Sequence, residues 1–404
     1  MSAMRIESIT VTGLLSFGWE PTTLELRPQT VLVGPNGSGK TNLLLALDLL
    51  RAAAFDIRSV PSAHGGALEF FHKGKGGDGR MVLEAVFTSD AWPPLRYSIT
   101  LAMEQDQLVI EEERLETRDD IGEDGPLSLA LVAVDRVLVR VRAEWDAGAD
   151  RSAMALFGPL RRHSMEFPRN GGLLRQYGQS REQAPWLADV AKTLDSIAVY
   201  HSLPLGSPGD PARLFQLADK DDRRLLPDGS NLALVLNRLK KDDKTRTRLL
   251  AEVCAVYEQL RDFDVDIRAG YVQLYVQEES GYSMSAGRLS SGTLRWLGLV
   301  TLLVDPAPPS VLCIDEPELG LHPDLIHRLA GLIKEASERC QVVITTHSPD
   351  LVSEFSDCPE SVVVCERPFD VTELKRLERE PLAHWLDEYS LGHAWQSGAI
   401  GGRR

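Results

Sequence analysis

A glycine-rich segment near the start of the chain carries the groups needed to hold a chain of phosphates. It follows the apolar run from Thr30 to Val33 and reads Gly34-Pro35-Asn36-Gly37-Ser38-Gly39-Lys40-Thr41. This is the strand–GxxxxGK[ST]–helix pattern of a phosphate-binding loop (P-loop), in which backbone N–H groups of the turn and of the helix N-terminus face the phosphates. We expect Lys40 to reach the β- and γ-phosphates and the Thr41 hydroxyl to coordinate Mg²⁺. The segment therefore predicts a nucleotide site.

Two carboxylates stand at the end of a second apolar run. Val311 to Ile314 reads as a buried strand, and Asp315 and Glu316 follow it. We expect Asp315 to hold Mg²⁺, directly or through water, and Glu316 to polarise the attacking water as the general base. An acidic pair at a strand end is often only a turn or a helix cap, but the P-loop upstream favours the catalytic role.

A histidine follows the next buried run. Gln341 to Thr346 reads as a third strand, with His347 directly after it. A lone histidine is more often structural than catalytic. One strand beyond the carboxylate pair, however, is where a side chain that senses the γ-phosphate belongs. We therefore count His347 with Glu316 and Lys40 among the catalytic candidates.

The fourth segment, Leu289-Ser290-Ser291-Gly292-Thr293, resembles the signature LSGGQ of ABC ATPases, with Ser290 at the serine and Gly292 at the second glycine. All four segments together resemble ABC-type ATPases of the RecF, SMC and OLD class, in particular the bacterial AAA-family ATPases often found with defence effectors. Leu15 to Gly18 and Tyr389 to Gly392 share this resemblance. It implies ATP and Mg²⁺ as cofactors and a head-to-tail homodimer, or a higher assembly. In such a dimer the signature of one subunit closes on the nucleotide of the other.

Two departures from the ABC pattern affect the predicted site. The signature reads Ser-Gly-Thr where transporters have Gly-Gly-Gln. ABC ATPases also carry a glutamine, between the P-loop helix and the signature, that contacts Mg²⁺ and the γ-phosphate, whereas no Gln occurs here between Gln29 and Gln105. The segment from Phe70 to Lys75 falls where that loop is expected. His72 or Lys75 is therefore a candidate replacement.

These segments require an α/β architecture, because phosphate-binding loops lie at the carboxyl ends of parallel strands. The resemblance implies an ABC-ATPase head, with a mostly parallel P-loop sheet, an antiparallel β-subdomain and a compact, largely helical insert. We predict an N-terminal ATPase lobe over 1–145, the insert over 146–260 and a C-terminal ATPase lobe over 261–404. A hairpin is expected from 263 to 277. No heptad repeat is sustained, so no long coiled coil is expected.

Composition places the chain among ordinary globular proteins, with 43% hydrophobic and 25% charged residues. No apolar run has the length needed to span a bilayer, and the first residues lack the pattern of a secretory signal. We therefore expect a cytoplasmic protein with no membrane partner. The five cysteines include no C-x-x-C pair, so a zinc site is not expected, and Cys313 reads as a core residue of its strand.

The net charge of −15 argues against a generally basic nucleic-acid binder. Arginines are nevertheless concentrated between 151 and 182: Arg151, Arg161, Arg162, Arg169, Arg175 and Arg181, against Glu166 and Glu182. A charge run is most often a solvated face. The alternative is a surface for DNA or for an acidic partner protein, with Tyr177 and Trp186 as anchors, although core packing is the more usual role for Trp186.

Three uses of such an ATPase compete. It could be the sensor or scaffold of a bacterial antiphage defence system that controls a separate effector protein. It could instead be a RecF-like DNA-binding ATPase in DNA repair or maintenance, or a transporter subunit. Transport fits least, because the insert is long and the coupling glutamine is absent. A nuclease domain of the OLD kind is not expected, since only 57 residues (404 − 347) follow His347. We expect the defence switch.

Overall fold

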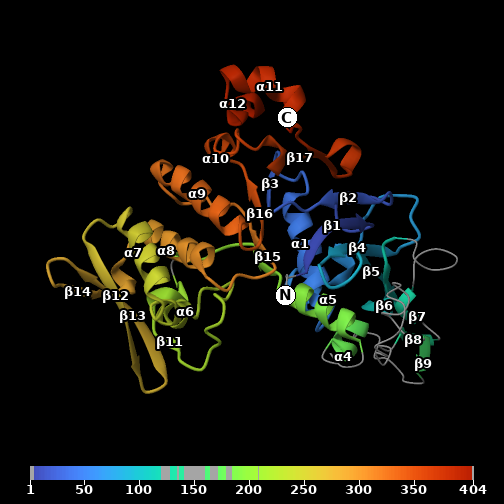
Figure 1. Ribbon diagram of the computed structural model, residues 1–404, viewed down its shortest axis with the longest axis horizontal. Helices are drawn as coiled ribbons and strands as arrows, with labels where there is room; N and C mark the ends of the chain where they lie inside the picture. The colour runs from blue at the N-terminus through green and yellow to red at the C-terminus, as the bar shows by residue number, and fades with distance from the viewer. Residues whose placement is uncertain are drawn as a thin grey trace, which may run out of the picture. The chain divides into compact units, whose positions relative to one another are not determined.

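The computed structural model describes residues 4–119, 128–133, 136–140, 160–163, 172–178, 184–207 and 209–402 (Figure 1). The chain divides into two compact units. The first, which we call the P-loop unit, comprises Met1–Ala198, Val363–Leu377 and Ile400–Arg404. The second, the signature unit, comprises Val199–Val362 and Glu378–Ala399. The three-part division expected from the sequence stays a prediction.

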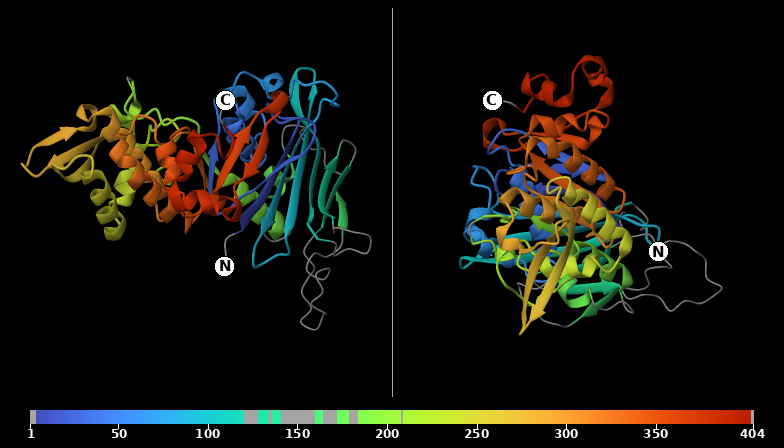
Figure 2. Two further views of the ribbon diagram at one scale, coloured as in Figure 1. Left: turned by 90° about the horizontal axis from the view of Figure 1, so that it is seen from above. Right: turned by 90° about the vertical axis from the view of Figure 1, so that its left-hand side faces the viewer.

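The P-loop unit contains a large antiparallel sheet with the strand order β2-β1-β4-β5-β6-β7-β8-β9. Its strands are β1 (Arg5–Thr12), β2 (Thr22–Glu25), β4 (Met81–Thr88), β5 (Leu95–Glu104), β6 (Gln107–Thr117), β7 (Ser128–Ala133), β8 (Arg136–Arg140) and β9 (Leu160–His163). Figure 2 (left) shows the strands of this sheet side by side. Every second residue of β4 is buried, because alternate side chains of a strand face opposite sides. The predicted antiparallel subdomain is confirmed.

Three further strands of this unit lie next to the P-loop. They are β3 (Gln29–Val33), β17 (Val362–Glu366) and β18 (Glu373–Arg376), neighbours in that order. β17 and β18 are antiparallel, with Val364 opposite Lys375. Helix α1 (Lys40–Ala52) begins directly after the P-loop and buries its leucines at 43, 44, 47 and 50.

Three further α-helices are described in the P-loop unit. They are α2 (Ser59–Ala63), α4 (Leu173–Tyr177) and α5 (Pro185–Asp195), and α5 packs against α1. Trp186 in α5 is fully buried, with its ring edge-on to that of Trp92 at 5.8 Å between centroids. Trp186 therefore packs in the core, as its residue type suggested, and does not anchor a partner.

A buried carboxylate joins the antiparallel sheet to α4. Glu113 in β6 is fully buried and accepts hydrogen bonds from Leu173 N at 2.6 Å and from the Tyr97 hydroxyl at 2.8 Å. Burial raises the pKa of Glu113 to about 7, although the bonds from Tyr97 and Leu173 oppose that rise. The start of α4 is thus tied to the sheet by one ionisable group.

The arginine-rich stretch falls mostly beyond this description. Arg151, Arg169, Arg181, Glu166 and Glu182 lie outside the described residues. Arg161 and Arg162 belong to β9, and Arg175 is exposed on α4, which Tyr177 ends. A surface for DNA or an acidic partner on this stretch stays a prediction.

The signature unit begins with β10 (Ala198–Tyr200) and a β-ribbon. The ribbon comprises β11 (Gln216–Leu217), β12 (Leu260–Arg268), β13 (Tyr271–Glu278) and β14 (Ser283–Ser285). β12 and β13 pair across Ala269-Gly270, so the predicted hairpin is confirmed. Helices α6 (Leu232–Leu239) and α7 (Asp243–Cys254) pack on β12.

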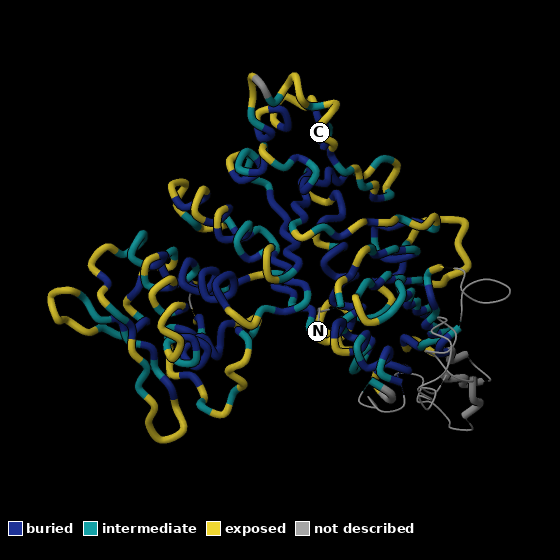
Figure 3. Tube along the Cα trace, in the orientation of Figure 1, coloured by how far each residue is buried: buried dark blue, intermediate teal, exposed yellow. Residues whose placement is uncertain are grey.

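The core of the signature unit consists of parallel strands and covering helices. Strands β15 (Val311–Ile314) and β16 (Gln341–Thr346) are parallel, with β10 beside β15, and both have the buried colour in Figure 3. Cys313 is fully buried in β15, as expected. The helices are α8 (Ser291–Val304), α9 (Ile326–Ser337), α10 (Pro349–Ser353), α11 (Arg379–Glu388) and α12 (Leu391–Gln396).

Helix length bears on two expectations. Within the described ranges the longest helix, α8, has 14 residues, so these ranges contain no long coiled coil. In the same part of the chain, no helix combines the length and the apolar character needed to cross a bilayer.

Candidate nucleotide-binding site

The P-loop adopts a conformation that depends on glycine. Gly34 and Gly39 have φ angles of 154° and 100°. A Cβ atom at Gly34 would lie 2.2 Å from the Cys365 carbonyl oxygen, and one at Gly39 would lie 2.1 Å from Oγ1 of Thr372. Both positions therefore exclude a side chain, for reasons of backbone angle and of space. The β17–β18 segment is packed directly against the loop.

Thr372 supports the P-loop from behind. Its fully buried hydroxyl lies 3.0 Å from the Ser38 carbonyl oxygen and 2.7 Å from the Ser16 hydroxyl. Ser16 also accepts a hydrogen bond from Asn42 Nδ2 at 2.7 Å, which ties the network to the first turn of α1. Three segments far apart in the sequence thus hold the loop in one conformation.

The P-loop presents groups suited to an anion. Lys40 is only 5% exposed, and its ammonium group donates to the carbonyl oxygens of Gly34 at 2.9 Å and Pro35 at 3.0 Å. The Ser38 hydroxyl is buried without a hydrogen-bond partner. The helix N-terminus after Gly39 adds backbone N–H groups that no turn of α1 can satisfy. A phosphate group would satisfy these donors, so the residues present fit the predicted ligand.

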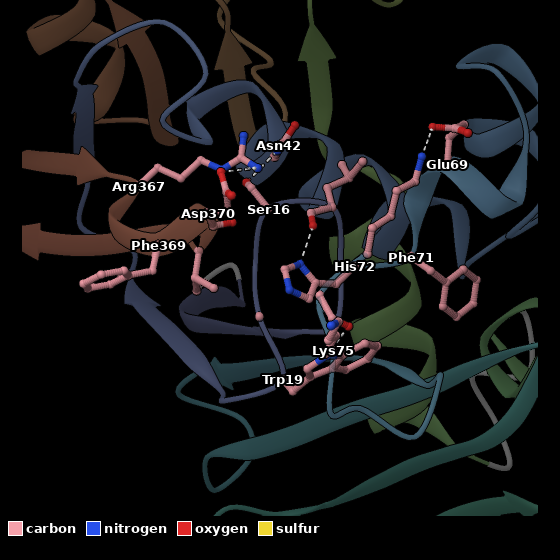
Figure 4. A pocket seen from close by; sticks show the side chains of 15 residues that line it. Ser16, Trp19, Asn42, Glu69, Phe71, His72, Lys75, Arg367, Phe369 and Asp370 are labelled. Atoms are coloured by element: carbon pink, nitrogen blue, oxygen red, sulfur yellow. Dashed lines mark hydrogen bonds and ion pairs between the residues drawn. The ribbon is translucent and has the colours of Figure 1, made fainter. Parts of the chain in front are cut away.

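Two cavities lie beside the P-loop. The first, of about 440 Å³, is lined by the turn from Pro35 to Ser38 and by 366–368 and Gly402. The second, of about 720 Å³, is lined by Ser16 and Asn42 on one side and by the 71–75 segment on another (Figure 4). His72 and Lys75, the two candidates for the missing glutamine, both line this second cavity.

His72 and Trp19 form one wall of the larger cavity. His72 Nδ1 lies 2.8 Å from the Leu15 carbonyl oxygen, and Trp19 Nε1 donates to the Gly74 carbonyl oxygen at 3.1 Å. The two rings meet edge to face at 5.5 Å between centroids. The wall is therefore aromatic and fixed, beside the polar groups of Ser16 and Asn42.

The carboxylate pair and the histidine meet in the signature unit. Glu316 Oε1 lies 3.2 Å from His347 Nε2, and both side chains are about one-third exposed, at 28% and 32%. Thr345, at the end of β16, donates its hydroxyl to Asp315 and accepts from Glu316 N at 3.0 Å. Glu316 has a φ of 46°, rare for a residue with a side chain. Such strain is retained where the surroundings enforce it, often at functional sites.

Two residues of this cluster, Glu318 and Arg295, are not among the site residues predicted from the sequence. Glu318 accepts bonds from the Thr346 hydroxyl at 2.5 Å and from His347 N at 3.1 Å, and burial raises its pKa. Arg295 donates to the carbonyl oxygens of Leu203 at 2.8 Å and Glu316 at 3.3 Å. Glu318 stands two residues after Glu316 in the Asp-Glu-Pro-Glu run, which is the signal that could have singled it out.

The signature segment forms the start of α8. Ser290 is the N-cap, and its hydroxyl accepts from Thr293 N at 3.1 Å. Ser290 is exposed, and Gly292 has only the Gly320 carbonyl oxygen within 4 Å of where a Cβ would be. The exposed helix start can therefore accept a ligand from outside its own unit.

The two units divide the predicted site residues between them. The P-loop unit holds Asn36, Gly37, Ser38, Gly39, Lys40 and Thr41. The signature unit holds Ser290, Gly292, Asp315, Glu316 and His347. In the signature unit Asp315, Glu316 and His347 are neighbours, whereas Ser290 and Gly292 lie at the start of α8. The joint action of all these residues on one nucleotide stays a prediction.

The chain matches the protein family described as "AAA domain, putative AbiEii toxin, Type IV TA system" over residues 30–137 and 207–353. These ranges include all four segments of the predicted site. Two curated relatives, both energy-coupling factor transporter ATP-binding protein EcfA2 from strains of Staphylococcus epidermidis, are 32% identical over 77 residues. That match covers 19% of this chain and 26% of each relative, so the chain spans about a quarter of their length.

Solved structures with a similar fold include heads of SMC proteins. One is the SMC head bound to the C-winged helix domain of ScpA, with 15% identity, a TM-score of 0.52 and coverage of 94% of this chain and 99% of that chain. Another is the SMC head with an extended coiled coil bound to the C-terminal domain of ScpA derived from Pyrococcus furiosus. It has 13% identity, a TM-score of 0.54 and coverage of 95% of this chain and 99% of that chain. At these identities the likeness shows the fold alone.

Proposed function

The chain belongs to this AAA-domain family and is an ABC-type ATPase of the RecF, SMC and OLD class, and on that premise we propose that it hydrolyses ATP. The observation that carries the proposal is the contact of Glu316 with His347 beside Asp315. In this scheme Glu316 accepts a proton from the attacking water, and His347 orients Glu316 and senses the γ-phosphate. Lys40 neutralises charge on the β- and γ-phosphates.

Magnesium is the metal that fits the predicted donors. The Thr41 hydroxyl and the Asp315 carboxylate would hold it, and both offer the oxygen ligands that Mg²⁺ prefers. Among the described residues no cluster of three or more His, Cys, Asp or Glu side chains could hold a metal by itself. Phosphate oxygens would therefore complete the coordination, and the metal would neutralise charge on them.

The larger cavity is the proposed site of the nucleoside. It is lined by Asn42, two residues after Lys40, so it adjoins the turn where the phosphates would lie. Ser16 and Asn42 offer hydrogen-bonding groups, and Trp19 and His72 offer aromatic surface. We expect His72 and Lys75 to contact the nucleotide from this wall.

The proposed ATPase works as a head-to-tail dimer. The exposed start of α8 at Ser290 and Ser291 supports this arrangement, because it can contact the γ-phosphate held by the P-loop of a second subunit. ATP would then join the subunits, and hydrolysis would release them. Such a switch can pass its nucleotide state to a partner molecule.

The proposed use of the switch is in antiphage defence, as sensor or scaffold for a separate effector protein. The family description, which names a toxin of a type IV toxin–antitoxin system, supports a two-component arrangement. The two SMC heads of similar fold are each bound to a domain of ScpA, which supports the proposal of a protein partner.

Three measurements test these proposals. Phosphate release from ATP by the purified chain tests hydrolysis, with Glu316→Gln as the inactive control. Copurification with the product of a neighbouring gene tests the effector. Salt-sensitive DNA binding by the ATP-bound Glu316→Gln variant would favour the RecF-like alternative instead.

A further inference from the structure

Arg213 makes four hydrogen bonds around the signature segment. Its Nη1 donates to the carbonyl oxygens of Gly287 at 3.0 Å and Leu289 at 2.8 Å. Its Nη2 donates to the Gly206 carbonyl oxygen at 3.0 Å and to the Ser291 hydroxyl at 3.1 Å. The acceptors at Leu289 and Ser291 flank Ser290 on both sides. Each of the four N–H groups on the two terminal nitrogens therefore has an acceptor.

We propose that Arg213 is a positioning residue that holds the signature segment in the conformation that receives the ATP of the second subunit. This inference rests on the proposed dimeric ATPase. Arg213 itself does not contact the nucleotide in this scheme. It acts through Ser290 and the first N–H groups of α8, whose orientation it sets by holding Leu289 and Ser291.

Gly206 supports the same segment from a second direction. The Ser291 hydroxyl donates to the Gly206 carbonyl oxygen at 2.5 Å. A Cβ atom at Gly206, where φ is 86°, would lie 2.5 Å from the Ser291 carbonyl oxygen and 2.6 Å from its Cα. The loop therefore approaches the signature backbone as closely as only glycine permits.

Asp210 fixes the loop that carries Gly206 and Arg213. Its side chain is 1% exposed, accepts from Gly206 N and from Ala212 N at 2.7 Å, and caps the 3₁₀ helix Pro211–Arg213. One carboxylate thus ties Gly206 to the 3₁₀ helix that carries Arg213. Such hydrogen bonds to the supporting backbone help a residue to position another.

The chemistry of arginine suits this role better than that of lysine. A guanidinium is planar and directs its N–H groups to several acceptors at once, whereas an ammonium has at most three donors on a flexible stem. Arg213 is half-buried, so its bonds to carbonyl oxygens are shielded in part from water. Arg213→Ala leaves the carbonyls of Gly287 and Leu289 without this donor, and Arg213→Lys restores part of the contact.

The first test separates nucleotide binding from subunit association, in a Glu316→Gln background that prevents turnover. We expect Arg213→Ala to weaken ATP-dependent dimerisation, measured by sedimentation, at least about tenfold, because several charge-assisted hydrogen bonds are lost. ATP affinity of the dilute chain should change by less than about twofold, since the P-loop belongs to the other unit. Arg213→Lys should give a dimerisation affinity between those of Arg213→Ala and the parent chain. Arg268 is exposed on the β12–β13 hairpin, so Arg268→Ala is the matched control.

The second test uses mixtures of defective chains. A mixture of Arg213→Ala chains and Lys40→Ala chains should regain ATPase activity. Each mixed dimer has one site that combines an intact P-loop with an intact signature. Arg213→Ala with Ser290→Arg should not regain activity, because every site then has a damaged signature. Recovery in the latter mixture, or loss of ATP affinity in dilute Arg213→Ala chains, would overturn the positioning role. If Glu316→Gln chains do not associate with ATP at all, the proposed dimer fails, and the inference fails with it.

Discussion

Glu316 and His347 contact each other across the ends of two adjacent parallel strands, with 3.2 Å between Oε1 and Nε2. Glu316 makes this contact with a positive φ angle, which residues with a side chain rarely adopt. A carboxylate paired in this way is oriented before substrate arrives, which is what a general base requires.

Replacement of that carboxylate separates binding from hydrolysis. Glu316→Gln keeps the shape of the side chain but removes the base, so we expect it to bind ATP and to turn over at least about a hundredfold more slowly. Lys40→Ala should lose nucleotide binding itself. Single-turnover phosphate release and equilibrium binding of ATP measure the two effects. Hydrolysis by Glu316→Gln at the wild-type rate would show that the base is a different group.

Subunit complementation tests whether the sites are shared. Lys40→Ala and Ser290→Arg chains should each be inactive alone, and their mixture should regain partial activity, because a mixed dimer contains one site without either change. The measurement is ATPase rate against mixing ratio, with mixed dimers confirmed by differential tags. Confirmed mixed dimers without any recovery would count against composite sites, or show that both sites must act together.

The wall of the larger cavity should set the affinity for ATP. His72 lines the proposed nucleoside site, and contacts to the nucleoside do not change as the γ-phosphate reacts. His72→Ala should therefore raise KM about fivefold with little change in kcat. His64→Ala, an exposed histidine of the same unit outside the cavity lining, serves as the control. An unchanged KM in His72→Ala would remove this wall from the nucleotide site.

Glu113 should make stability depend on pH. Burial raises its folded-state pKa from the ordinary 4.5 to about 7, so the folded protein holds this proton more tightly than the unfolded chain. The resulting stabilisation is fully present below pH 4.5 and is lost as pH rises through 7. Its full size is about 3 kcal/mol at most.

The measurement for Glu113 is the urea midpoint at several pH values in that window. Wild type should lose stability relative to Glu113→Gln as pH rises, since the amide does not titrate. Glu112→Gln, on the opposite face of the same strand, should follow the wild-type curve. Parallel curves for wild type and Glu113→Gln would contradict the assignment.

Local pattern predicted those parts of the site that are local in the chain. The P-loop, the strand before Asp315 and the strand before His347 each combine an apolar run with polar residues a few positions on, and the structure has them as expected. Contacts between segments far apart in the chain produce no comparable pattern in the sequence. The bonds of Thr372 to the P-loop and of Arg213 to the signature depend on packing, and the positive φ of Glu316 depends on it as well.

The contact of Thr372 with Ser38 spans 334 residues, and its contact with Ser16 spans 356. During synthesis the glycine loop therefore leaves the ribosome long before Thr372, which precedes β18 and supports the loop. Contacts between residues so far apart in the sequence are slow to form, because a long loop must first be closed. A nascent chain should consequently be unable to retain ATP until its last strands have emerged. In the proposed dimer, unfinished chains would then hold no ATP and would not associate with finished subunits.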